Sequence, residues 1–239
     1  ASLMRQMTGS GIAMNRIQIP WLVALVVLLA TVAPLSSSAQ NASTKTQKRP
    51  AKKRPPQFQP PEVQPGLPNV LLIGDSISIG YMLATRKELS GEANVWRPPT
   101  NCGPTTRGLE SLEDWLGDRK WDVIHFNFGL HDLKFMGPNN ENLADPKSET
   151  SHQQVPIDQY VANLTKIAKR LKKTGAKVIW CETTPVPEGA KGRVVGDSKR
   201  YNEAAAKAIK ELGDIEIDPL YSFAIQHARF QKKANVHYS

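Results

Sequence analysis

Short apolar runs alternate with longer amphipathic stretches between residues 69 and 239. Runs of branched and aromatic side chains predict strands in five places, at 70–73, 94–97, 121–129, 177–181 and 215–217. Apolar residues at helical spacing predict a helix after each strand, at 76–89, from 105 or 106 to about 116, at 156–172, 197–212 and 219–232. Strands that alternate with helices are typical of a parallel sheet with helices on both faces.

The alternation therefore predicts a doubly wound α/β fold with right-handed crossovers. If the strand order is 2-1-3-4-5, the order reverses between the first and third strands. Ligands bind such sheets at the carboxyl ends of the strands, next to this reversal. Ser76 follows the first strand and the turn at 129–132 follows the third, so we expect both to face one crevice.

A glycine ends the first apolar run, and polar residues that suit a helix N-terminus follow it. Asp75, Ser76 and Ser78 are all favoured N-cap residue types. A nucleophile on this strand-to-helix turn could use backbone N–H groups of the helix start to stabilise an oxyanion. An ordinary helix cap is the alternative interpretation, and Gly-Asp-Ser alone is compatible with both.

The chain before residue 69 differs in composition from the segment that follows. Residues 17–33 are almost wholly apolar, Arg16 precedes them, and small residues stand at 37 and 39. This is the three-part pattern of a secretory signal peptide that begins at Met14, with a membrane anchor as the alternative. We therefore expect residues 1–39 to be a leader plus signal peptide, and the mature protein to be secreted or periplasmic.

Residues 40–68 are polar and then rich in proline, lysine and arginine, so we expect a disordered linker rather than part of a core. The formal net charge of the chain is +9, and residues 1–68 account for +7 of it. The remaining +2 argues against a nucleic-acid-binding domain. A weak contact of the linker with an anionic polymer or membrane surface is one interpretation of its charge, and a solvated spacer is the other.

The cysteines and glycines exclude several kinds of site. Cys102 lies in a predicted loop and Cys181 in a predicted strand, which favours two separate buried thiols over a disulfide. No Cys/His spacing suggests zinc, and no glycine-rich phosphate loop or Gly-x-Gly-x-x-Gly follows the first strand. We therefore expect neither a metal nor a cofactor.

Four segments, in chain order, resemble the sequence blocks of the SGNH (GDSL-type) hydrolases. They are Gly-Asp-Ser-Ile-Ser at 74–78, Asn-Cys-Gly-Pro-Thr-Thr-Arg-Gly at 101–108, Gly-Leu-His-Asp at 129–132 and Val-His-Tyr-Ser at 236–239. The resemblance spans residues 69–239. It implies one hydrolase domain with a flavodoxin-like three-layer α/β/α sandwich, whose five-stranded parallel sheet has the order 2-1-3-4-5, and metal-free ester hydrolysis.

By position, the resemblance implies that Ser76 is the nucleophile and His237 its general base. The oxyanion hole would use the N–H groups of Ser76 and Gly103 together with His131, and Asn127 is an alternative donor. Asp75, Asp132 and Asn235 are expected to support the site. A serine hydroxyl needs an adjacent base, and an imidazole titrates in the right range.

Three departures from the family pattern bear on the site. His131 stands where the third block normally has asparagine. Ala234 stands where an aspartate normally precedes the histidine by three residues, which leaves Asn235 as the nearest polar side chain. We therefore expect a Ser–His dyad oriented by a backbone carbonyl, and a gain in turnover from Ala234→Asp. The final helix that follows the histidine in family members is expected to be missing.

The leading functional prediction is an exported serine esterase that cleaves short-chain or acetyl esters of carbohydrates or small alcohols. The polar loop at 132–155 is expected to shape its pocket. A catalytically degenerate member that binds a glycan or acyl ligand is the alternative. A surface-associated protein that acts through its basic tail is the third interpretation.

Overall fold

The structure is a computed structural model that describes residues 54–239. The predicted signal peptide and the linker up to residue 53 lie outside the described residues. Among the described helices, none has the length and apolar character that a membrane crossing requires.

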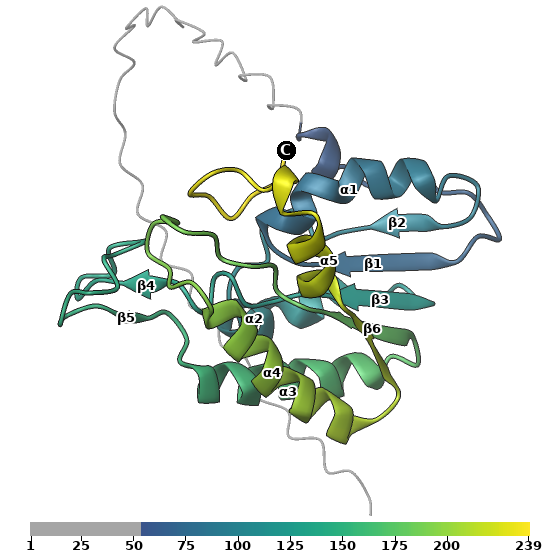
Figure 1. The fold of residues 1–239 in the computed structure, drawn as a ribbon. Coiled ribbons are helices and arrows are strands. Elements are labelled where there is room, and N and C mark those ends of the chain that lie inside the picture. The colour runs from purple at the N-terminus through teal and green to yellow at the C-terminus, as the bar shows by residue number, and fades with distance from the viewer. Residues whose placement is uncertain (1–53) are drawn as a thin grey trace, which may run out of the picture. The chain divides into compact units, whose positions relative to one another are not determined.

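A five-stranded parallel sheet forms the centre of the domain (Figure 1). Its strands, in spatial order, are β2 (Asn94–Trp96), β1 (Asn69–Ile73), β3 (Val123–Phe126), β6 (Lys177–Cys181) and β7 (Ile215–Asp218). Counted within this sheet, the order is 2-1-3-4-5, so the predicted topology is confirmed. A separate two-stranded hairpin, β4 (Phe135–Met136) with β5 (His152–Gln153), lies within the loop predicted at 132–155.

Helices cover both faces of the sheet. They are α1 (Ser76–Glu88), α2 (Thr105–Leu116), α3 (Ile157–Lys172), α4 (Asp197–Leu212) and α5 (Leu220–Gln226), with two short 3-10 helices, η1 (Pro56–Phe58) and η2 (Ala228–Phe230). The helices α2, α3 and α4 pack side by side on one face, and α1 and α5 lie on the other (Figure 1). The three-layer α/β/α class is therefore confirmed.

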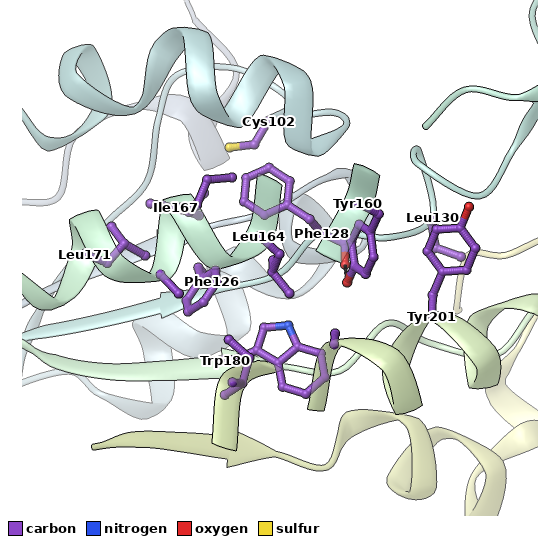
Figure 2. Close-up of a cluster of buried hydrophobic side chains, with 14 of the residues drawn as sticks. Cys102, Phe126, Phe128, Leu130, Tyr160, Leu164, Ile167, Leu171, Trp180 and Tyr201 are labelled. Carbon is purple, nitrogen blue, oxygen red and sulfur yellow. Dashed lines mark hydrogen bonds between the residues drawn. The ribbon is translucent and has the colours of Figure 1, made fainter. Parts of the chain in front are cut away.

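The larger core lies between the sheet and α2, α3 and α4, as Figure 2 shows. Phe126 and Trp180 project from neighbouring strands and are fully buried. Two buried tyrosine hydroxyls have partners: Tyr160 donates to the Phe128 carbonyl at 3.0 Å, and Tyr201 donates to the Val155 carbonyl at 2.8 Å. These bonds connect α3 and α4 to the segments that follow β3 and β5.

The linker prediction is wrong for residues 54–68, which pack against the domain. The Arg86 guanidinium donates to the Gln59 carbonyl at 2.8 Å. The Asn94 side chain accepts from the Gln64 N–H at 2.8 Å and donates to the Gln64 carbonyl at 3.0 Å. Proline-rich chain needs few hydrogen bonds of its own, so a few side-chain contacts are enough to hold it on a folded surface.

The predicted helix at 219–232 is also wrong in length, because α5 ends at Gln226. The His227 side chain bonds the Phe223 carbonyl, and a single 3-10 turn follows. The chain then reverses: the Lys232 N–H donates to the His237 carbonyl and the Ser239 N–H donates to the Phe230 carbonyl, both at 2.9 Å. This reversal returns the last residues to the carboxyl edge of the sheet.

Candidate active site

Ser76 is the first residue of α1 and sits on a tight turn after β1. The Asp75 carboxylate caps the helix by accepting the Ile77 N–H at 2.9 Å. A Cβ atom at Gly74 would lie 2.9 Å from the Ser78 hydroxyl, so the turn has room for glycine only. Among the described residues, no hydrogen bond uses the Ser76 N–H, which leaves it as a donor at the helix start.

Two hydrogen bonds connect Ser76, His237 and Asn235 in a chain. The Ser76 Oγ atom lies 2.8 Å from His237 Nε2, and Asn235 Oδ1 lies 2.7 Å from His237 Nδ1. The same Oδ1 atom accepts the His237 backbone N–H at 3.1 Å. Because an amide oxygen only accepts hydrogen bonds, Nδ1 carries the ring hydrogen and Nε2 is left to accept the Ser76 hydroxyl.

This geometry corrects the expectation that a backbone carbonyl replaces the missing triad acid. The group that orients the ring is the Asn235 side chain rather than a backbone carbonyl. Ala234 is exposed and has a positive φ of 53°, because it forms the turn that precedes Asn235. The acid position of the family pattern is therefore replaced by an amide one residue later in the chain.

The predicted oxyanion donor Gly103 already has an acceptor. Its N–H donates to the Asn101 side-chain oxygen at 2.9 Å, in a local turn that has φ of 65° at the glycine. Asn101 lines a pocket with Ser76 and His131, although the sequence did not single it out as a site residue. The Ser76 N–H and the His131 ring are therefore the better placed donors for an oxyanion.

His131 lies on the turn after β3 and lines the same pocket as Ser76 and His237. Burial lowers the pKa of His131, and the positive charges of Lys134 and Arg193 lower it further. The ring is therefore neutral at pH 7, and a neutral imidazole offers one N–H donor.

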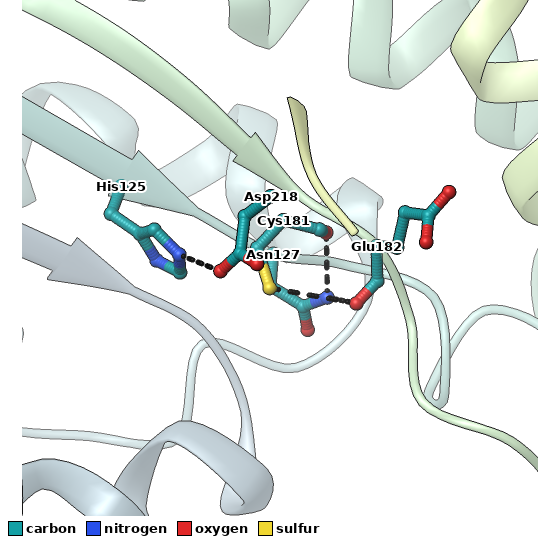
Figure 3. Close-up of polar contacts among 5 residues, drawn as sticks. All are labelled: His125, Asn127, Cys181, Glu182 and Asp218. Atoms are coloured by element: carbon teal, nitrogen blue, oxygen red, sulfur yellow. Dashed lines mark hydrogen bonds and ion pairs between the residues drawn. The ribbon is translucent and has the colours of Figure 1, made fainter. Parts of the chain in front are cut away.

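Asn127 cannot take the place of His131. Its side-chain amide donates to the Cys181 carbonyl at 2.9 Å and to the Glu182 carbonyl at 3.1 Å, which ties the end of β3 to the end of β6 (Figure 3). With its amide hydrogens directed at these carbonyls, Asn127 holds the sheet edge together instead of facing Ser76. The alternative oxyanion donor is therefore excluded by this geometry.

Asp132 is buried and supports the turn that carries His131. The buried carboxylate accepts the Thr105 N–H at 2.8 Å and the Thr105 hydroxyl at 2.5 Å. These bonds fix the turn that carries His131 to the first residue of α2. Burial is the main cause that raises the pKa of Asp132, to about 7.

Figure 3 shows a second polar cluster, in which the potential metal-ligand atoms of His125, Cys181 and Asp218 all lie within 4.8 Å. His125 bonds the Asp218 carboxylate at 2.9 Å, so its side chain has a partner within the sheet. Burial raises the pKa of the Cys181 thiol well above its usual range. Cys102 and Cys181 are both free and buried, as predicted. None of these four residues lines the pockets beside Ser76.

Two pockets meet at Ser76 and His237, which line both of them. The first has a volume of about 460 Å³, and apolar side chains dominate it: Ile77, Tyr81, Leu220, Ala224, Phe223 and Phe230. The second, called the polar pocket below, has a volume of about 360 Å³. Beside Leu143, Ala190, Ala234 and Val236, its lining has a set of polar and basic side chains that the first pocket lacks: Asn101, His131, Lys134, Asn142, Lys191 and Arg193. The hairpin region after β3 supplies several of these residues, so the loop predicted at 132–155 does shape a pocket.

Comparison with family models gives one match, to the GDSL-like lipase/acylhydrolase family, over residues 70–238. The chain belongs to this family. It is an ester hydrolase of the GDSL type, as the sequence blocks predicted. A search of curated proteins found no match.

Several solved structures are similar to the chain. An acetyl xylan esterase aligns with a TM-score of 0.55 and 14% identity over 72% of this chain and 91% of its own. A lipase/acylhydrolase from Enterococcus faecalis aligns with a TM-score of 0.56 and 16% identity over 72% and 88%. A catalytic mutant of an acetylxylan esterase from Geobacillus stearothermophilus aligns with a TM-score of 0.54 and 14% identity over 72% and 87%. At these identities the similarity shows the shared fold.

Proposed function

We propose that this protein hydrolyses acyl esters with Ser76 as the nucleophile, His237 as the general base and Asn235 as the residue that orients the base. One observation carries the proposal: the hydrogen-bonded chain in which Asn235 and His237 lie 2.7 Å apart and His237 and Ser76 lie 2.8 Å apart. A nucleophile and base within hydrogen-bond reach, with the base oriented by a third group, is the arrangement that covalent acyl transfer needs. An amide in the third position also occurs in Cys–His–Asn proteases.

The proposed reaction begins when Ser76 Oγ attacks the ester carbonyl carbon and His237 Nε2 takes the hydroxyl proton. The Ser76 N–H and the neutral His131 ring donate to the oxyanion of the tetrahedral intermediate. His237 then gives the proton to the departing alcohol, which leaves an acyl group on Ser76. Water attacks this acyl-enzyme in the same way, with His237 again as the base, and the carboxylic acid is released.

The two pockets suggest how the ester divides between them. Acyl groups are hydrocarbon chains, so the apolar pocket beside Phe223 and Phe230 suits the acyl half. The alcohol half, which is polar in a carbohydrate, suits the pocket beside Asn101 and His131. Similarity to acetyl xylan esterases supports a carbohydrate ester. A pocket of about 460 Å³ is within the range of small-molecule sites, so it has room for short acyl chains beyond acetyl.

The remaining predictions about cellular context are proposals too. The three-part pattern of residues 14–39 supports a secreted or periplasmic location. The lysines and arginines of residues 45–54 support a weak contact with an anionic polymer or membrane surface, which would fade as salt rises.

The test is release of 4-nitrophenol from 4-nitrophenyl acetate and butyrate by the purified protein. Ser76→Ala should abolish turnover, whereas Ser90→Ala, an exposed serine just after α1, should not change it. Full turnover by Ser76→Ala would end the nucleophile assignment. No turnover by the parent, with ligand binding retained, would favour the alternative of a degenerate member that binds a glycan or acyl ligand.

A further inference from the structure

Two cations line the polar pocket without an acidic partner. Lys134 is 8% exposed, and Arg193 is half-buried. Within residues 54–239, neither has a carboxylate oxygen within 4 Å, although six ion pairs of that kind occur elsewhere in this range. The Arg193 Nε–H donates to the Leu130 carbonyl at 3.1 Å. Within the described residues, its two terminal nitrogens donate no hydrogen bond.

The fold brings these two cations together from distant parts of the chain. The segment after Lys134 is tied to the segment before Arg193 by a bond from the Phe135 N–H to the Gly192 carbonyl at 2.8 Å. A Cβ atom at Gly192 would overlap the Leu143 backbone, so the glycine permits this close approach. The exposed Lys191 adds a third cation to the same pocket.

Two nearby carboxylates offset only part of the pocket's charge: Asp132 raises the pKa of Lys134 and Asp75 raises the pKa of Arg193, yet both pKa values remain lowered. Asp132 is bonded to Thr105 through Oδ1, and because its pKa is raised to about 7 it is only partly charged at neutral pH. Asp75 caps α1. Neither residue lines the pocket, and no other carboxylate does.

Burial of unpaired positive charge is costly in a folded protein. Burial lowers the pKa of both Lys134 and Arg193, and the charge of Arg193 lowers the pKa of Lys134 further. Arrangements that cost stability persist in proteins where function needs them. A negative charge on a bound molecule would offset this cost, and it would do so beside Ser76.

We propose that the polar pocket recognises an anionic group on the alcohol half of the ester, so that the substrates are esters of acidic alcohols. This inference rests on the proposed function and adds the substrate class to it. The anion can be a carboxylate, as in a uronic acid, or a sulfate or phosphate ester. The alcohol half is chosen because the apolar pocket on the other side of Ser76 suits the acyl half. Lys134 and Arg193 would bind the anion, and Asn142 in the same lining offers a polar group for hydroxyls.

The test compares 4-acetoxybenzenesulfonate with 4-acetoxybenzenesulfonamide, two aryl acetates of similar shape that differ by one charge. With each kcat/KM divided by the ester's rate with hydroxide, the parent should prefer the sulfonate about tenfold or more. Lys134→Gln and Arg193→Gln should each remove most of this preference, measured within each variant as the ratio of the two normalised kcat/KM values. Lys134→Arg should keep the preference, and so should Lys166→Gln, an exposed lysine on α3 that does not line the pocket.

Failure of this inference differs from failure of the proposed function. Hydrolysis of the sulfonamide ester that is lost in Ser76→Ala supports the function. Equal normalised kcat/KM for the sulfonamide ester and for the sulfonate, carboxylate and phosphate esters would overturn the inference alone. If none of these esters is turned over, calorimetric titration with 4-hydroxybenzenesulfonate and 4-hydroxybenzenesulfonamide decides it. Tighter binding of the sulfonate, weakened in Lys134→Gln, supports the inference, and equal binding overturns it.

Two further experiments identify which anion the pocket prefers and test whether Lys134 only supports the fold. Turnover of 4-acetoxybenzoate and 4-acetoxyphenyl phosphate distinguishes carboxylate and phosphate from the sulfonate, and preference for any one of the three over the neutral ester supports the inference. Because Lys134 has no acidic partner, Lys134→Gln should keep or raise the melting temperature. A fall of more than about 5 °C would mean that Lys134 supports the fold rather than the ligand.

Discussion

Replacing Asn235 by aspartate tests whether this side chain orients His237 and stabilises the imidazolium that forms during the reaction. The Asn235 side chain accepts from both the ring and the backbone N–H of His237, and it is exposed. Asn235→Asp keeps an acceptor for both hydrogens and adds one negative charge. When His237 takes the proton from Ser76, the imidazolium would then face a carboxylate instead of a neutral amide.

The magnitude follows from the separation and exposure of the two charges. Unit charges about 4 Å apart interact by about 1 kcal/mol in water and about 4 kcal/mol at an effective dielectric constant of 20. Because Asn235 is exposed, we take a value near the lower end, about 1.4 kcal/mol, which is about tenfold in kcat. The same stabilisation of the imidazolium should move the ascending limb of the pH–rate profile up by about one pH unit.

The assay is kcat for 4-nitrophenyl acetate at a series of pH values between 5 and 9. Asn235→Ala removes the acceptor for ring and backbone and should lower the plateau at least tenfold. Ala234→Asp should bring no gain, because residue 234 forms the exposed turn and Asn235 already occupies the orienting position. An unshifted profile in Asn235→Asp, together with parent-like turnover in Asn235→Ala, would refute the role of Asn235.

Three other predictions concern the turn after β3. His131→Ala should lower kcat about 10²-fold in steady-state assays. His131→Asn supplies an amide donor in place of the imidazole and should keep most of the parent kcat. An equal loss of kcat in both variants would argue against His131 as an oxyanion donor. The pKa of Asp132, about 7 when folded, lies above its unfolded value of about 3.9, so the folded state holds the proton longer. The free energy of unfolding should therefore fall as pH rises from about 4 to about 7, by at most about 4 kcal/mol, and urea titrations of Asp132→Asn should lack this contribution. Gly129→Ala would place its Cβ atom against the Thr183 side chain, at a residue whose φ is 151°. The substitution should lower the free energy of unfolding by about 1–3 kcal/mol in thermal unfolding. An unchanged melting temperature would show that the turn can relax.

The fold was predictable because its signals are local. Each strand of the main sheet contains branched or aromatic apolar residues in a short segment, and the parallel order follows from the helices between the strands. The exceptions are segments whose conformation depends on distant partners. Residues 54–68 have the composition of a linker, yet Arg86 and Asn94 hold them on the domain. No pattern within the segment itself indicates these contacts.

The candidate site was predictable at Ser76 and His237, because the family blocks mark both residues. Asn235 was expected only to support the site. Its bond to the His237 ring was not predictable, since it depends on a reversal of the chain that backbone bonds between residues 230 and 239 create. The capture of the Gly103 N–H by Asn101 had a local signal, an asparagine two residues before a glycine. No local signal indicated that Lys134 and Arg193 share a pocket, because 58 residues separate them in the sequence and only the fold brings them together.

The central claim is that His237 activates Ser76 for attack on an acyl carbonyl. The most direct measurement is peptide mass spectrometry after reaction with diethyl 4-nitrophenyl phosphate, a reagent that phosphorylates activated serine hydroxyls. One adduct should form on Ser76 as esterase activity is lost, at a rate at least about 100-fold lower in His237→Ala, and Ser76→Ala should stay unlabelled. Complete inactivation with the adduct on another residue, or labelling of Ser76 at the parent rate in His237→Ala, would contradict the account.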